Sequence, residues 1–152
     1  MGLLVYISGC TDNEPSNNEE LSNELHILNW EDYFAPNLIE DFEEAYGVTI
    51  SIETFDEEDY MISKLETNPG YYDLVIASDS TVRELIETRS LAIIDKTNIP
   101  NFENIDSSFL DKSFDRDNQY SIPYLWGTTG IAYNDSAIPE GISSWASLWN
   151  ES

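Results

Sequence analysis

The feature that most constrains the fold is an uninterrupted apolar run, Leu74-Val75-Ile76-Ala77, which ends at Ser78-Asp79-Ser80. A strand that is apolar on both faces is typical of the centre of a parallel sheet that is covered on both sides. Parallel strands need long crossover connections, and these are usually helices. The run therefore predicts an α/β fold.

The segments around this run supply the alternation of strands and helices that such a fold needs. Val48, Ile50 and Ile52 alternate with polar residues, as in a strand with one buried face. The patterns predict strands at 25–28, 48–52, 73–77 and 91–94, helices at 36–46 and 56–67, a third helix starting at 78 or 79, extended segments at 120–124 and 127–134, and a helix from 143. This order favours a mostly parallel sheet, and ligands of such sheets bind beyond the carboxyl ends of the strands.

The charge of the chain narrows the class of partner. It has 30 Asp and Glu against 6 Lys and Arg, a formal net charge of −24. Phosphate groups need basic side chains, so we expect no nucleic-acid partner and no attraction to an anionic membrane surface. A small cation would be drawn in by the field. The alternative is an acidic surface that serves only solubility.

The first ten residues resemble a lipoprotein signal. An apolar stretch from Leu3 leads through Ser8-Gly9 to Cys10, like the lipobox of bacterial lipoproteins, whose cysteine carries the lipid. Residues 1–10 are thus expected to be a truncated signal, because no basic residue precedes Lys64, and the polar residues 11–24 a disordered tether. The protein would then be periplasmic or at the cell surface, anchored to the membrane through Cys10. The alternative is an ordinary first strand with a buried cysteine.

Candidate binding residues follow two of the predicted strands. Trp30, Glu31, Asp32 and Tyr33 come after the first strand, and 78–80 follow the central one. A carboxylate can pair with an ammonium group, and aromatic faces attract cations and cover methylene chains. The set suits an elongated amine. The alternative is that the two aromatic side chains pack at the edge of the core and the two acids form a surface pair.

Several segments resemble one family. The segment N-W-E-D-Y-F-A-P at residues 29–36 is similar to the N-W-S/T-D/E-Y-x-x-P motif of bacterial spermidine/putrescine-binding proteins, the extracytoplasmic receptors of polyamine ABC transporters. Similar segments follow in the family's order at 72–78, 91–96, 121–131 and 144–149. Ordered matches at the right spacing are more specific than any one match, and together they span the chain from residue 25.

The resemblance implies roles for individual residues. Trp30 and Tyr33 would line an aromatic box, Asp32 would bind an amine, and Ser78 would contribute a hydroxyl group. Two positions depart from the family pattern. Glu31 stands where the family usually has Ser or Thr and adds a charge near the site. Ser80 stands where some spermidine binders have Tyr and putrescine-type members have Ser, which favours a shorter amine.

The resemblance also implies an architecture of two lobes that close on the ligand about a hinge. Residues 25–126 would form a type II periplasmic-binding-protein-like first lobe, and 127–152 the hinge crossing and the start of a truncated second lobe. We expect a monomer that delivers a polyamine to an ABC transporter permease, with no cofactor, no metal and no enzymatic activity. Alternatives are a binding lipoprotein for another small cationic or polar solute, a sensory receptor, and a hydrolase that uses two carboxylates.

Overall fold

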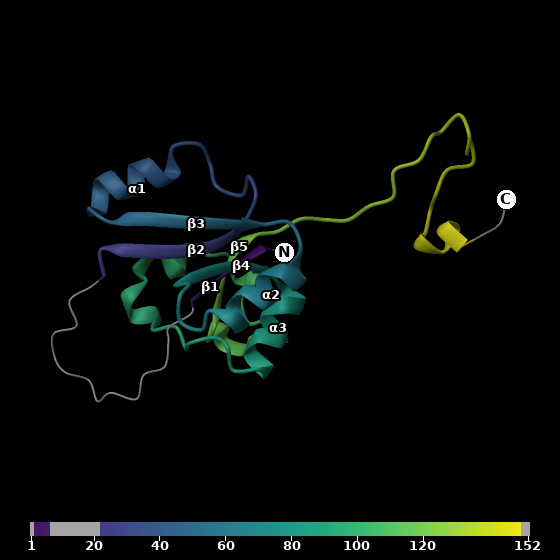
Figure 1. Ribbon diagram of the computed structural model, residues 1–152. Coiled ribbons are helices and arrows are strands. Elements are labelled where there is room, and N and C mark those ends of the chain that lie inside the picture. Colours follow the sequence, from purple (N-terminus) through teal and green to yellow (C-terminus); the bar gives the residue numbers. More distant parts are fainter. Residues whose placement is uncertain (1, 7–21, 150–152) are drawn as a thin grey trace.

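The computed structural model describes residues 2–6 and 22–149, and its centre is a five-stranded sheet (Figure 1). The strands are β1 (Gly2–Tyr6), β2 (Glu24–Trp30), β3 (Thr49–Phe55), β4 (Leu74–Ser78) and β5 (Ser121–Leu125). Their order across the sheet is β3-β2-β4-β1-β5. β2 pairs in parallel with β3 and β4, whereas β1 pairs antiparallel with β4 and β5. β1 alone of these strands runs the other way, which confirms the predicted mostly parallel sheet.

β1 differs from the signal segment predicted at this position. The structure inserts the backbone of residues 2–6 between β4 and β5, with Gly2 opposite Ser78 and Tyr6 opposite Leu74, as the alternative interpretation expected of a first strand. Cys10 and residues 11–21 of the predicted tether lie outside the described residues. The last residues of that tether already belong to the fold, because the Thr49 backbone N–H donates to the Asn23 carbonyl at 2.7 Å and Glu24 starts β2.

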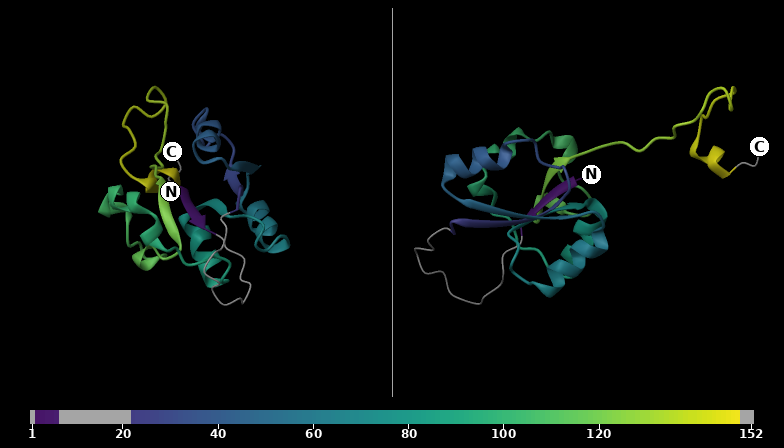
Figure 2. Two further views of the ribbon diagram at one scale, coloured as in Figure 1. Left: turned by 90° about the vertical axis from the view of Figure 1, so that its left-hand side faces the viewer. Right: turned by 45° about the horizontal axis from the view of Figure 1, so that its top comes forward.

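Three α-helices lie close to their predicted positions. They are α1 (Leu38–Tyr46), α2 (Glu58–Thr67) and α3 (Asp79–Glu87). α1 runs alongside the edge strand β3, and α2 and α3 lie next to each other against the sheet (Figures 1 and 2). Gly47 ends α1 with a φ of 67°, a left-handed conformation that glycine adopts without a steric penalty.

Two predicted elements are wrong. Residues 91–94 form no strand, although Leu91 and Ile94 are buried. The apolar pattern at 91–94 therefore indicated buried side chains but not strand pairing. The helix expected from residue 143 is a 3₁₀ turn at Trp145–Trp149. Four more 3₁₀ turns connect α3 to β5, at Lys96–Asn98, Pro100–Asn104, Ser107–Phe109 and Arg116–Asn118.

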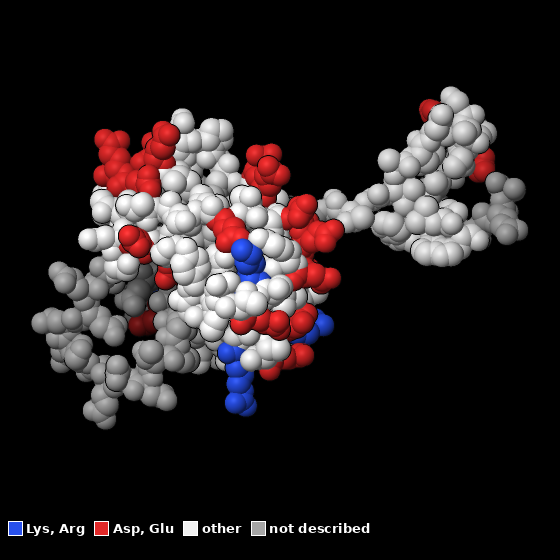
Figure 3. All heavy atoms as spheres, viewed as in Figure 1, with Lys and Arg blue, Asp and Glu red and all other residues white. Residues whose placement is uncertain are grey.

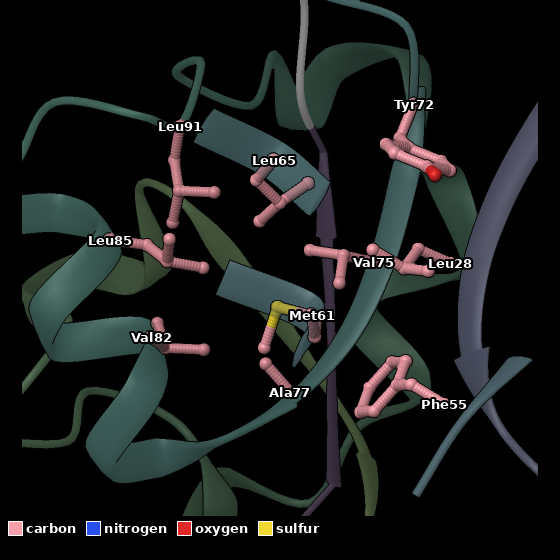
Figure 4. Packing of buried hydrophobic residues seen from close by; sticks show 10 residues of the cluster. All are labelled: Leu28, Phe55, Met61, Leu65, Tyr72, Val75, Ala77, Val82, Leu85 and Leu91. Carbon is pink, nitrogen blue, oxygen red and sulfur yellow. The ribbon is translucent and has the colours of Figure 1, made fainter. Parts of the chain in front are cut away.

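The hydrophobic core lies between the sheet and the helices α2 and α3. Leu28 of β2 and Val75 of β4 are fully buried and face Met61 of α2 and Val82 of α3 (Figure 4). Fully burying side chains of this size stabilises the fold by about 1.5–3 kcal/mol each. The core therefore fixes the carboxyl ends of β2 and β4 relative to the start of α2 and α3.

A polar network joins β3 to α2 on the same side of the sheet. The Glu53 carboxylate accepts hydrogen bonds from the hydroxyl groups of Tyr72 at 2.5 Å and Tyr60 at 3.1 Å, and its distance to Lys64 Nζ is 2.6 Å. The Lys64 ammonium and then the Tyr72 hydroxyl stabilise the ionised carboxylate, so the pKa of Glu53 lies below its ordinary value.

The charged side chains are spread over the surface. Acidic groups cover much of the visible face of the sheet-and-helix body, with few basic groups among them (Figure 3). After β5 the chain leaves the sheet in an extended conformation and ends in the turn at Trp145–Trp149 (Figures 1 and 2). Within residues 2–6 and 22–149, no helix combines the length and apolar character needed to cross a membrane.

Candidate functional site

The ends of β2 and β4 bring the predicted site residues to one edge of the sheet. β2 and β4 run parallel with Leu28 opposite Val75, so Trp30 at the end of β2 and Ser78 at the end of β4 lie at the same edge. This confirms that the two loops after these strands are neighbours. Their side chains nevertheless form two groups.

The first group lines a cleft. Asp32 and Tyr33, in the loop after β2, face the segment that leaves β5 across a cleft of about 630 Å³. The lining residues from that segment are Leu125, Trp126, Gly127, Thr128 and Thr129. Asp32 has a φ of 60°, a left-handed conformation that Asp tolerates better than most residues and that turns the loop sharply after β2. Glu31 is exposed beside it but does not line the cleft.

Trp30 connects the cleft to the core. Its ring lies 4.5 Å from that of Phe55 and 6.1 Å from that of Tyr33, measured between centroids. Trp30 is half-buried and packs against the core cluster, whereas Tyr33 is 38% exposed. Core-edge packing, one of the two interpretations of these aromatics, thus describes Trp30, and the Tyr33 ring is available at the surface of the cleft.

The second group is a cluster of hydroxyl groups at the start of α3. Ser78 Oγ lies 2.9 Å from Ser80 Oγ and 3.1 Å from Thr81 Oγ1. Ser78 is also the N-cap of α3, because its Oγ accepts the Thr81 backbone N–H at 3.4 Å. Both predicted serines therefore lie in one cluster, next to the loop that carries Asp32 but outside the cleft itself.

Two contributors were missed by the sequence analysis. Tyr124 of β5 donates its hydroxyl hydrogen to the Tyr33 carbonyl at 2.9 Å and so ties the loop after β2 to β5. The segment that leaves the sheet after β5 is called the crossing segment below. Glu58, the first residue of α2, accepts the Ser78 backbone N–H at 3.1 Å. The similar segment at 121–131 could have indicated Tyr124, whereas no local sequence signal connects Glu58 to Ser78.

Glu58 is ionised in this environment. Burial raises the pKa of its carboxyl group, but hydrogen bonds from the hydroxyl groups of Ser78 and Thr81 and from the Ser78 N–H outweigh burial, so its pKa lies below the ordinary value. In the part of the chain that the structure describes, no group of three or more His, Cys, Asp or Glu residues is placed to hold a metal ion. The edge of the sheet therefore offers carboxylates, hydroxyl groups and aromatic faces, which can hold an ammonium group and cover a methylene chain.

The model of a family described as bacterial extracellular solute-binding protein matches residues 37–151. The spermidine/putrescine-binding periplasmic protein of Escherichia coli (strain K12) is 39% identical over 130 residues, which are 84% of this chain and 37% of that protein. The putrescine-binding periplasmic protein PotF of the same organism is 35% identical over 112 residues, 72% of this chain and 30% of the relative.

Solved structures show the same similarity. The spermidine/putrescine ABC transporter substrate-binding protein PotD from Streptococcus pneumoniae matches with a TM-score of 0.76 and 38% identity, over 85% of this chain and 40% of that one. The Tp0655 (TpPotD) lipoprotein of Treponema pallidum matches with a TM-score of 0.74 and 31% identity, over 84% of this chain and 40% of the other. The chain thus spans less than half the length of these relatives.

Proposed function

The chain belongs to the family of bacterial extracellular solute-binding proteins, and we propose that it captures a polyamine, putrescine or spermidine, for an ABC importer. The observation that carries the proposal is the cleft at the carboxyl edge of the sheet, where Asp32 and Tyr33 face the crossing segment. The similarity to spermidine/putrescine-binding and putrescine-binding periplasmic proteins supports the ligand class.

Each predicted residue has a role in this proposal. Asp32 forms a charge-assisted hydrogen bond with one ammonium group, and the faces of Tyr33 and Trp30 cover the methylene chain. Ser78 and Ser80 offer hydroxyl oxygens to the ligand, and the small side chain of Ser80 favours the shorter putrescine. Glu31 adds negative charge beside Asp32, which strengthens the attraction of a dication to this edge.

The proposal places these residues in a two-lobed receptor. Residues 25–126 are the first lobe, and 127–152 are the hinge crossing and the start of the second lobe. Two observations support this division: the chain leaves the sheet after β5, and the relatives are more than twice as long as the part matched. The cleft lies between the loop after β2, which carries Asp32 and Tyr33, and the crossing segment, so it would narrow when the lobes close.

We also propose that the receptor acts outside the cytoplasmic membrane as a monomer, anchored by lipid on Cys10. The pattern of small residues before Cys10 supports the anchor, as does the similarity to the Tp0655 (TpPotD) lipoprotein of Treponema pallidum. Replacing the thiol tests it: Cys10→Ser should move the full-length protein from the membrane fraction to the soluble fraction. An unchanged distribution between the fractions would reject the anchor.

Calorimetric titration of the full-length protein with putrescine and spermidine tests the main proposal. The wild type should release or absorb heat with at least one of them, and Asp32→Asn should weaken binding about tenfold, because an exposed charged hydrogen bond contributes about 1.5 kcal/mol. Glu87→Gln is the control, since it removes one exposed acidic charge at the other end of α3. No heat with either amine, or equal affinities for the two variants, would overturn the proposal.

A further inference from the structure

Glu58 joins the start of α2 to the start of α3. It is the first residue of α2, and its Oε1 accepts the backbone N–H of Ser78 at 3.1 Å. Ser78 is the last residue of β4 and the N-cap of α3. The two helices lie next to each other against the sheet (Figure 1), and the Glu58 carboxylate bridges their N-terminal ends through the Ser78 N–H.

Side-chain oxygens occupy the backbone donors at the start of α3. The N–H of Ser78 binds Glu58, the N–H of Ser80 binds Asp79 Oδ1 at 3.0 Å, and the N–H of Thr81 binds Ser78 Oγ at 3.4 Å. Free N–H groups and the positive end of the helix dipole normally make a helix N-terminus attractive to anions. Here two carboxylates lie at that end, and the N–H groups of Ser78, Ser80 and Thr81 already have side-chain acceptors.

The hydroxyl cluster also offers acceptor sites beside the Glu58 carboxylate. A carboxylate and a hydroxyl cluster that share hydrogen bonds leave oxygen lone pairs for a further donor, because each hydroxyl group has one hydrogen and two acceptor sites. Ser78 Oγ is the shared member of the cluster, 2.9 Å from Ser80 Oγ and 3.1 Å from Thr81 Oγ1. An ammonium group, which has only donors, matches such a surface.

We propose that Glu58 is a specificity-determining and positioning residue of the polyamine site. It holds Ser78 through the backbone, and its negative charge makes the start of α3 favour cations over anions. The inference rests on the proposed function. It assigns the preference for cations at this end of the site to a residue that contacts Ser78 and was not among the predicted ligand-binding residues.

The test compares three variants of the full-length protein by titration with putrescine at fixed ionic strength. Glu58→Gln keeps an oxygen acceptor for the Ser78 N–H and removes the charge, and should weaken binding about fivefold through the lost Coulomb attraction. Glu58→Asp keeps the charge and should stay within about twofold of the wild type. Glu57→Gln is the matched control, since Glu57 is the exposed neighbour and its side chain makes no capping hydrogen bond.

Sulfate provides a second measurement that a purely structural role would not change. At equal ionic strength, sulfate should compete with putrescine more strongly in Glu58→Gln than in Glu57→Gln, because only Glu58→Gln removes the negative charge that lies against the start of α3. Circular dichroism of each variant checks that it is folded, and if Glu58→Gln does not fold, Glu58→Asp decides: a fivefold loss there shows that the charge is not the determinant.

The outcomes separate this inference from the proposed function. A wild type that binds neither amine overturns both. A wild type that binds putrescine, with Glu58→Gln and Glu57→Gln equal in affinity and in sulfate competition, overturns the role of Glu58 and leaves polyamine capture in place.

Discussion

The network around Glu53 allows a prediction for two substitutions that remove the same chemical group. Tyr72 and Tyr60 donate to the same carboxylate, at 2.5 Å and 3.1 Å. Tyr72 is only 2% exposed, whereas Tyr60 is 45% exposed. Phenylalanine removes one hydroxyl group in each case and keeps the ring. The difference between Tyr72→Phe and Tyr60→Phe therefore compares a short, buried hydrogen bond with a longer, exposed one to the same acceptor.

The size of each loss of stability depends on whether water can replace the missing hydroxyl group. A hydrogen bond to a charged group contributes about 1.5–3 kcal/mol to stability. The Glu53 side chain is 35% exposed, so water partly replaces the Tyr72 hydroxyl and the expected loss is at the lower end, about 1.5 kcal/mol. The Tyr60 hydroxyl already meets water, and its loss should stay below about 0.5 kcal/mol.

Urea unfolding followed by tryptophan fluorescence measures both values, and Trp30 against Phe55 is a suitable reporter of the packed sheet. The pH supplies an internal check. Because the pKa of Glu53 is lower in the folded protein, its stabilisation is present above the ordinary value of 4.5 and is lost as the pH falls through the folded value. The penalty of Tyr72→Phe should shrink over that range. Equal losses for the two variants, or a penalty independent of pH, would refute the reasoning.

Three further predictions concern stability. Leu28→Ala should lower the free energy of unfolding by about 3 kcal/mol through the cavity left in the core, against less than about 1 kcal/mol for Ile52→Ala at an exposed position, both in urea. Ser78→Ala should cost about 0.5–1 kcal/mol because it removes the cap of α3, and an unchanged midpoint would contradict the cap. Burial and then the Glu53 carboxylate raise the pKa of Tyr72 to about 12, so its stabilisation is present below about pH 10 and is lost as the pH rises through about 12. In a pH titration followed by tyrosinate absorbance, one tyrosine should ionise at a higher pH than the others, and Tyr72→Phe should remove that step.

Local patterns predicted most of the strands and helices because each has a buried face that repeats with the period of its element. Val75 and Ala77 face the helices. α1 is the exception: its apolar residues Phe42 and Tyr46 are 40% and 69% exposed, so the sequence predicted the helix but not how little of it is buried.

The parts that the sequence could not predict depend on contacts between distant segments. β1 is a strand only because β4 and β5 leave a space between them, and the same apolar residues are equally typical of a signal segment. The site shows the same limit. Motif similarity predicted Trp30, Asp32 and Tyr33 as site residues, whereas Glu58 reaches Ser78 across 20 positions of sequence and has no pattern of its own.

The position of β1 has a consequence for secretion. If cleavage before Cys10 releases the leader, the residues of β1 leave with it, and the backbone groups of β4 and β5 that face them lose their partners. Unpaired backbone groups inside a sheet are costly, so in a chain cleaved before Cys10 strands β4 and β5 would have to pair with each other or with another strand. A cleaved and an uncleaved chain would then differ in strand pairing at this position of the sheet.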